Sequence, residues 1–144
     1  MTARCVPPAE RAAIEELNAR FAWALDLGEF DNLRQVFTSE ARYVSGERIY
    51  AGVDAIVSRF TARTGPRTTR HGWSSLTLQA TGDKIYGLSS WYTFAANQDA
   101  PISGTGVYLV ADFVDIYVSI ADVGWRIAER TIHPVFKDER LAPT

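Results

Sequence analysis

The spacing of hydrophobic residues changes once along this chain, and that change limits the folds open to it. Before Arg70, apolar side chains recur every three or four positions, which is the period of an amphipathic helix. From Arg70 onward they recur every second position, which is the period of a half-buried β-strand. Helices followed by strands predict an α+β fold in which the helices cover one face of a sheet.

Three helices are predicted before Arg70. The longest starts after Pro7 and Pro8 and ends near Gly28, and in FDNLRQVF the side chain of Asp31 is placed to cap a short second helix. Between the second and third helices, ARYVSGERIYAG has the composition of a small hairpin. The apolar faces are Ile14, Leu17, Phe21 and Leu25 in the first helix, Leu33, Val36 and Phe37 in the second, and Val53, Ile56, Val57 and Phe60 in the third.

Four long strands are predicted after Arg70. The first contains SSLTLQA, and the others are KIYGLSSWYTFA, TGVYLVADFVDIYVSI and GWRIAERTIHPVF. Short or glycine-containing turns join them, which predicts an antiparallel meander that forms a strongly curved sheet. The strand VYLVADFVDIYVSI is apolar on both faces, so we expect another copy of the chain to cover its outer face, in a dimer or a trimer.

Composition excludes several classes of protein. A chain of 144 residues suits one domain over residues 1–144, with a core at about 11–136. A net charge of -2 argues against nucleic acid, since the only basic cluster is Arg59, Arg63, Arg67 and Arg70. The single Cys5, two distant histidines and the absence of a glycine-rich loop predict no disulfide, metal or cofactor. No apolar segment suits a signal peptide or a membrane span, so we expect a cytoplasmic protein.

One histidine, His71, stands where the basic segment TARTGPRTTR enters the first strand. Histidine gains and loses a proton near neutral pH. By parity His71 shares a face with Trp73 and Ser75, the mixture of aromatic and polar side chains that lines pockets. The alternative is an ordinary residue at a strand end. His133, which precedes a proline near the end of the last strand, is the second candidate base.

An aspartate, Asp26, lies in the last turn of the first helix, where the helix dipole disfavours negative charge. It is either buried and functional or a solvated residue that opens the turn DLGEF. Arg130 shares parity with Ala128 on the last strand, opposite Ile127. Its guanidinium either faces a cavity and holds an anion, or faces solvent and pairs with a residue such as Glu129 or Asp112.

Other side chains are candidates for ligand contact. Asp112 interrupts an apolar strand and is either a polar group in the pocket or a charge at the edge of the sheet. Large rings wall a pocket with few side chains, and a tyrosine hydroxyl can orient a substrate oxygen. The candidate substrate-binding residues are Tyr43, Trp73, Ser75, Trp91, Tyr108 and Asp112.

The element order, with AIEELNARFAWALDLGEFDNLRQVFTSEARYVSG, TRH and GWRIAER, resembles the SnoaL-like branch of the nuclear-transport-factor-2-like superfamily, from about Arg11 to Phe136. It looks most similar to the group of scytalone dehydratase and hexachlorocyclohexane dehydrochlorinase. The resemblance implies a cone-shaped α+β barrel and a catalytic set of Asp26, His71 and Arg130. Ser75 departs from the pattern, since many relatives have asparagine there.

This resemblance implies a cofactor-independent lyase or isomerase that acts on a small, mostly apolar cyclic molecule. If Asp26 accepts the ring N–H of His71, the other ring nitrogen is free to take a proton from carbon. Elimination, double-bond isomerisation and aldol-type cyclisation all begin with that step. The alternative is a module that binds a small ligand, or assembles with other copies, without catalysis.

Overall fold

The computed structural model describes residues 2–144 and has the predicted order of helices before strands. The helical elements are α1 (Pro8–Asp26), η1 (Phe30–Gln35), α2 (Val53–Thr61) and η2 (Glu139–Leu141). The strands are β1 (Phe37–Ser45), β2 (Arg48–Ala51), β3 (Thr68–Thr81), β4 (Lys84–Ala96), β5 (Val107–Ile120) and β6 (Gly124–Lys137). The predicted α+β fold and the antiparallel meander from β3 to β6 are confirmed.

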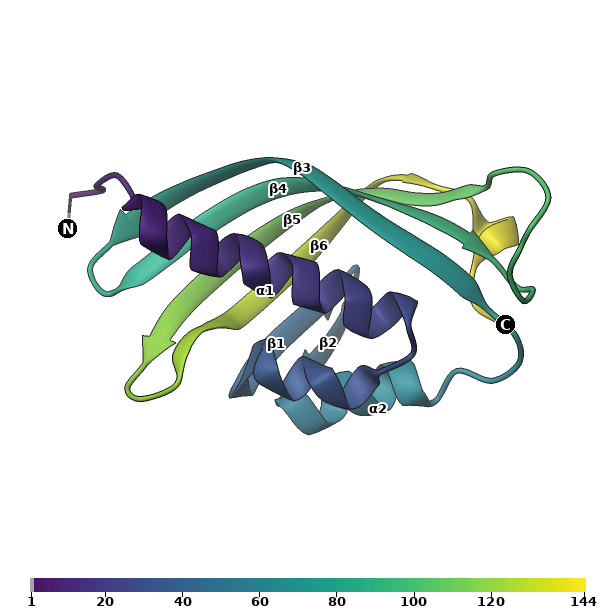
Figure 1. Ribbon diagram of the computed structural model, residues 1–144, viewed down its shortest axis with the longest axis horizontal. Coiled ribbons are helices and arrows are strands. Elements are labelled where there is room, and N and C mark those ends of the chain that lie inside the picture. Colours follow the sequence, from purple (N-terminus) through teal and green to yellow (C-terminus); the bar gives the residue numbers. More distant parts are fainter. Residues whose placement is uncertain (1) are drawn as a thin grey trace.

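One sheet holds all six strands, in the order β2, β1, β6, β5, β4, β3. The pair β1 and β6 is parallel and the other neighbours are antiparallel, so the sheet is mixed. The sheet is curved but stays open, because β2 and β3 remain at opposite edges (Figure 1). Because β3 is an edge strand, alternate backbone N–H groups of β3 have no strand partner and are free to donate to side chains of the site.

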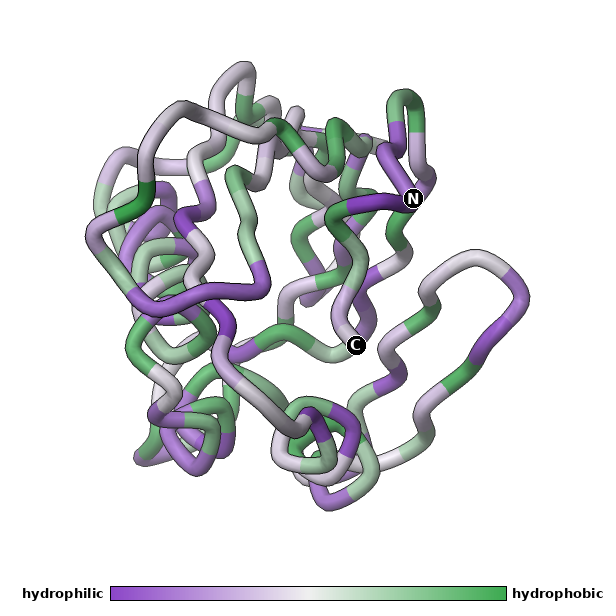
Figure 2. The backbone as a smooth tube through the Cα atoms, turned by 90° about the vertical axis from the view of Figure 1, so that its right-hand side faces the viewer, coloured by the Kyte–Doolittle hydropathy of each residue, from purple (hydrophilic) through white to green (hydrophobic). Residues whose placement is uncertain are grey.

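Helix α1 lies across the concave face of the sheet and contacts both β3 and β6 (Figure 1). Its buried face includes the predicted Ile14, Leu17, Phe21 and Leu25, because these residues repeat at helical spacing. Hydrophobic and hydrophilic residues are interspersed along the backbone in Figure 2, and in β4 every second residue from Ile85 to Ala95 is buried. The core therefore lies between α1 and the concave face, with α2 and η1 closing one end.

The capping prediction for the second helix is wrong. This element is a 3-10 helix whose N-cap is Glu29, and no side chain bonds its first turn. Asp31 lies inside the element, is exposed, and pairs with Arg34 at 3.4 Å. An exposed pair of this kind contributes little to stability.

Among the register shifts of the sheet, one in β3 and one in β6 alter which side chains near the site face the core. In β3, Ser74 pairs with Ser90 but Thr77 pairs with Leu88, and Ser75 between them has a φ of 58°. In β6, the pairing shifts between Ile116 and Tyr117 of the neighbouring β5. Each bulge inserts one residue into its strand, so simple alternation fails on its two sides.

None of the helices within residues 2–144 combines the length and the apolar character needed to span a membrane.

Candidate active site

Asp26 and His71 are in direct contact at the junction of α1 and β3. Asp26 Oδ1 lies 2.6 Å from His71 Nδ1, and the backbone N–H of His71 donates to Asp26 Oδ2 at 2.9 Å. The hydroxyl of Thr69 donates to Asp26 Oδ1 at 2.8 Å. The Asp26 side chain is only 2% exposed and the His71 side chain 12%. The solvated alternative for Asp26 is therefore not what the structure has.

Local structure explains why a carboxylate is held at this helix end. Asp26 is the last residue of α1, and no basic residue lies in the last turn of that helix. The dipole of α1 disfavours the charge, but Thr69 and His71 supply three hydrogen-bond donors that satisfy it. Thr69 and His71 are two positions apart on β3, so their side chains lie on the same face of the strand, toward α1.

The contact to Asp26 determines what His71 can do. A carboxylate accepts hydrogen bonds, so a neutral His71 that donates from Nδ1 carries no proton on Nε2. Nε2 is then the nitrogen that can accept a proton from a ligand. The ring of Phe21 meets the imidazole edge-on at 6.4 Å between centroids and limits its rotation.

A cavity of about 100 Å³ opens beside His71. Its lining combines aromatic and aliphatic side chains with four basic ones, Arg59, Arg63, Arg67 and Lys137. No aspartate or glutamate among residues 2–144 lines it. The lining residues are Phe21, Leu25, Tyr43, Ser45, Arg59, Phe60, Arg63, Arg67, Thr69, His71, Thr93, Tyr108, Leu109, Phe113, Ile132, Pro134 and Lys137.

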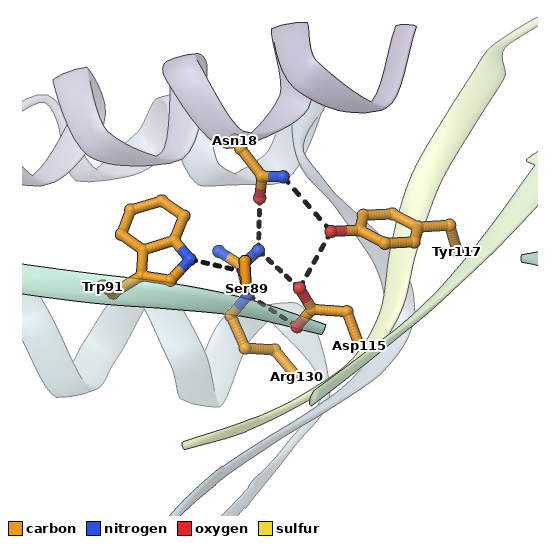
Figure 3. A network of polar contacts seen from close by, with 6 residues as sticks. All are labelled: Asn18, Ser89, Trp91, Asp115, Tyr117 and Arg130. Carbon is orange, nitrogen blue, oxygen red and sulfur yellow. Dashed lines mark hydrogen bonds and ion pairs between the residues drawn. The ribbon is translucent and has the colours of Figure 1, made fainter. Parts of the chain in front are cut away.

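Arg130 does not line this cavity, which corrects the predicted position of its guanidinium. It is 0% exposed and forms a paired contact with Asp115: Nε donates to Oδ1 and Nη2 to Oδ2, both at 2.9 Å. Nη2 also donates to Asn18 Oδ1 (Figure 3). Burial lowers the pKa of Arg130, but Asp115 more than offsets this and holds the pKa above its ordinary value.

The β6 bulge explains this inward placement. Ile127 and Arg130 are both fully buried, although strict alternation predicts opposite faces for them. Ile127 pairs with Tyr117 and Glu129 with Ile116, so Ala128 is the inserted residue.

The guanidinium of Arg130 lies beneath a layer of aromatic rings. Its central carbon is 4.5 Å from the ring centre of Phe21, 4.8 Å from that of Phe113 and 5.1 Å from that of Trp91. Nη1 of Arg130 is buried and has no hydrogen-bond partner, so ring faces replace the missing acceptor. Phe21 and Phe113 also line the cavity, so Arg130 packs behind the part of the cavity wall that these two rings form.

The predicted aromatic residues divide into two groups. Tyr43 and Tyr108 line the cavity. Trp91 does not line it: the indole stacks on Phe113 at 4.6 Å, and its N–H donates to Ser89 Oγ at 2.8 Å (Figure 3). Trp73 also stacks on Trp91, with 6.1 Å between ring centres. Both tryptophans therefore support the cavity wall without forming it.

Three other predicted residues lie away from His71. Ser75 is exposed, at the β3 bulge. Asp112 is exposed and alternates with the buried Phe113, so it faces the outer side of the sheet. His133 is exposed too and pairs in register with Asp112, so the second candidate base lies outside the cavity.

Sequence reasoning missed two members of the buried network, Asn18 and Asp115. Both are 0% exposed. Tyr117 connects them: its hydroxyl donates to Asp115 Oδ2 at 2.8 Å and accepts from Asn18 Nδ2 at 3.2 Å (Figure 3). A signal existed for each, because Asn18 follows the apolar stripe of α1 and Asp115 alternates with the large apolar residues of β5.

Within residues 2–144, no three side chains of histidine, cysteine, aspartate or glutamate are grouped in a way that could hold a metal ion. The side chains of the site that can move or hold a proton include Asp26, His71 and the phenols of Tyr43 and Tyr108.

These features match a known family. The SnoaL-like domain matches residues 9–131, and the chain belongs to that family. No curated protein matches the chain.

Solved structures share the fold at low sequence identity. ActVI-ORFA of Streptomyces coelicolor has a TM-score of 0.78 at 14% identity, over 88% of this chain and 97% of that one. A protein of Catenulispora acidiphila in complex with S-DNPA has a TM-score of 0.75 at 22% identity, over 89% and 95%. A nuclear-transport-factor-2-like protein of Salmonella enterica has a TM-score of 0.72 at 16% identity, over 90% and 93%. At these identities the likeness shows the fold alone.

Proposed function

We propose that this protein is a cofactor-independent lyase or isomerase in which Asp26 and His71 form a general-base dyad. The observation that carries the proposal is the 2.6 Å contact between Asp26 Oδ1 and His71 Nδ1, with His71 lining a cavity of aromatic, aliphatic and basic side chains. The buried carboxylate orients the imidazole and stabilises the imidazolium that forms when Nε2 takes a proton.

The reaction begins with removal of a proton from a substrate carbon. Nε2 of His71 takes that proton, and the electron pair of the C–H bond becomes an enolate or a new double bond. In an elimination the neighbouring hydroxyl or halide leaves with its bonding electrons, and the imidazolium returns the proton to a departing hydroxyl, which leaves as water. In an isomerisation the same proton returns to a different carbon.

Negative charge that develops on a substrate oxygen needs donors in the cavity. The phenol of Tyr43 is one candidate, because burial raises its pKa and so keeps the hydroxyl protonated, although Arg59 and Arg130 oppose this. Tyr108 and the arginines of the cavity are further candidates. Arg130 has a positioning role in this scheme, since it acts through Phe21 and Phe113.

The comparisons support the choice of a small-molecule function. The chain belongs to the SnoaL-like family, and a protein of the same fold has been solved with S-DNPA bound. The alternative function, binding of a small ligand without turnover, uses the same cavity. Turnover that depends on His71 separates the two functions.

The test is a screen of the purified protein, without added metal or nucleotide, against cyclic hydroxy-ketones, dehydratable phenols and halogenated rings. New conjugation is followed by ultraviolet absorbance. For any substrate found, His71→Ala is expected to lower kcat about 10²- to 10⁴-fold, the usual contribution of a general base.

The matched control is His133→Ala, which removes the other histidine from the outer side of the sheet and should leave kcat nearly unchanged. Turnover that survives His71→Ala but is lost in His133→Ala would disprove the dyad. Ligand binding with no turnover of any compound would favour the binding module.

We also propose that a second copy of the chain covers the outer face of β4 and β5. Tyr86, Leu88, Phe94 and Val114 are each between 42% and 50% exposed there, and Leu88 pairs directly with Val114. Contiguous apolar residues on a sheet face are typical of interfaces between protein chains. Sheet faces of identical shape suit a symmetric dimer.

A further inference from the structure

Three arginines converge on the cavity that holds His71, and none of them has a carboxylate partner within residues 2–144. Arg59 lies in the last turn of α2, and Arg63 and Arg67 follow in the connection to β3. All three line the cavity, but the ion pairs of the described chain involve other residues. The fourth basic residue of the lining, Lys137, pairs with Glu139 at 3.2 Å.

Each of these arginines lies over an aromatic ring, and the guanidinium carbon of Arg67 is 5.3 Å from the ring centre of Tyr108. The guanidinium carbon of Arg59 is 5.2 Å from the ring centre of Tyr43 and 5.1 Å from that of Phe60. The guanidinium carbon of Arg63 is 4.8 Å from the ring centre of Phe60. Such contacts stabilise a cation but do not cancel its charge. Both guanidinium groups therefore keep their capacity to bind an anion.

The third arginine is fixed before any ligand arrives. Nη1 of Arg67 donates to Asn97 Oδ1 at 2.7 Å and to the carbonyl of Leu141 at 2.8 Å. Its Nε is buried and has no hydrogen-bond partner. A charged group held rigidly by neutral partners is preorganised for a ligand of opposite charge.

The cluster opposes the charge of the whole chain, and it costs stability. Burial, together with Arg59 and Arg67, lowers the pKa of the Arg63 guanidinium to about 10. The chain has 17 acidic and 15 basic residues, so carboxylates are in excess, yet none lines this cavity. Like charges gathered in a cavity against their own repulsion are typical of functional sites.

We infer that the ligand of this cavity is a small cyclic molecule that carries a carboxylate, which Arg59, Arg63 and Arg67 hold while the ring faces His71. A guanidinium group matches the two oxygens of a carboxylate through paired N–H donors. A cavity of about 100 Å³ with aromatic walls suits one ring and one compact anion. The inference rests on the proposed function only where it places the ring beside the base.

The test compares benzoate with benzamide, which have the same ring and nearly the same shape but differ in charge. Dissociation constants are measured by NMR titration of the whole protein at low salt. Benzoate is expected to bind at least about tenfold more tightly than benzamide, the factor that corresponds to one charge-assisted hydrogen bond. Added salt should narrow the difference.

Substitutions test whether the preference for benzoate over benzamide depends on the arginine cluster. Arg63→Gln should weaken benzoate binding at least about tenfold and leave benzamide binding within about twofold. The matched control is Arg48→Gln, which makes the same change of charge at an exposed position on β2 and should leave benzoate binding within about twofold. Arg63→Lys, which keeps the charge, should retain most of the preference for benzoate.

Equal binding of benzoate and benzamide by the unmodified protein would overturn the inference. So would an Arg48→Gln variant that loses as much affinity for benzoate as Arg63→Gln. The proposed function fails separately. If carboxylates bind through Arg63 but nothing is turned over, the base chemistry is wrong and the ligand class stands. If His71 turns over neutral rings and benzoate does not compete, the ligand class is wrong and the chemistry stands.

Discussion

Replacement of Arg130 by methionine should be among the most destabilising single changes in this protein. Asp115 accepts three hydrogen bonds in a site without solvent, and two of them, both at 2.9 Å, come from Arg130. In Arg130→Met only the bond from Tyr117 remains, and a carboxylate is left in the core without a counter-charge. Removing one partner of a buried ion pair costs about 3–5 kcal/mol. Because native domains are stable by only about 5–15 kcal/mol, the variant loses a large part of its stability.

Arg130 and Asp115 should also behave as one energetic unit. Asp115→Leu should cost a similar amount, since it leaves Arg130 buried without its counter-charge. The double variant Arg130→Met/Asp115→Leu should recover most of the loss, because a buried pair replaced by packed apolar residues is often close to neutral. Tyr117 and Asn18 still bond to each other in the double variant. The coupling energy between the two positions should therefore exceed about 3 kcal/mol.

The assay is urea unfolding followed by tryptophan fluorescence, at one fixed protein concentration. Trp91 is a suitable reporter because it is 1% exposed and stacks on Phe113 in the core. The control is Arg42→Met, which breaks a surface pair with Glu129 at 3.9 Å and should cost less than about 1 kcal/mol. A loss below about 1 kcal/mol for Arg130→Met, or losses that simply add in the double variant, would refute this reasoning.

Four further predictions concern the dyad, the basic cluster and the outer face. Asp26→Asn should lower kcat for any substrate of His71 about 10²- to 10⁴-fold while circular dichroism stays unchanged; unaltered kcat would mean that the carboxylate is structural. Arg63→Gln should raise the free energy of unfolding at pH 7 by up to about 1 kcal/mol, measured by urea titration, because it removes a repelled cation; a loss above that size would show a structural role. Binding of benzoate should weaken as pH rises through about 10, because a lowered pKa means that Arg63 is charged below that pH and neutral above it. Leu88→Lys should shift the protein to a smaller species in light scattering after gel filtration, and an unchanged mass would place the interface elsewhere.

The fold was predictable because its elements depend on periodic patterns that tertiary contacts reinforce. Ile14, Leu17, Phe21 and Leu25 repeat at helical spacing and all face the core. The buried residues of β4 alternate without interruption from Ile85 to Ala95, so its two faces could be read correctly. Local preference and tertiary packing agree in both elements, and the helices and strands follow from them.

Position within the candidate site was harder to predict wherever a strand is irregular. The β6 bulge at Ala128 turns Arg130 inward, and no residue type in GWRIAER marks that insertion. The true partner of Arg130 is Asp115, directly opposite on β5, whereas the sequence offered Asp112 and Glu129 as equally suitable carboxylates. Register decides between such residues, and register depends on bulges that a single sequence does not reveal.

The contact between Asp26 and His71 was predicted from the family resemblance alone, and both ends of it lie in regular structure. Asp26 ends a long helix and His71 lies near the start of a long strand, before the bulge at Ser75. The basic cluster of Arg59, Arg63 and Arg67 was visible in the sequence, since these residues recur every four positions. The sequence did not show which way the cluster faces, because the packing of α2 against β1 and η1 turns it toward the cavity of His71.

Arg130 has a carboxylate partner, whereas Arg59 and Arg63 have none among residues 2–144. This difference gives them different roles. Arg130 is neutralised by Asp115 and enclosed, so its charge stabilises the layer of Phe21 and Phe113 above it. Arg59 and Arg63 line the cavity, lie over aromatic rings and have no carboxylate partner among residues 2–144, so their charge is destabilising until an anion binds. A ligand carboxylate would relieve that cost, and relief of repulsion in the free protein adds to the affinity for the ligand. Of these arginines, Arg59 and Arg63 line the cavity that also contains His71 and Arg130 does not, so an anionic ligand in the cavity would meet the uncompensated charges.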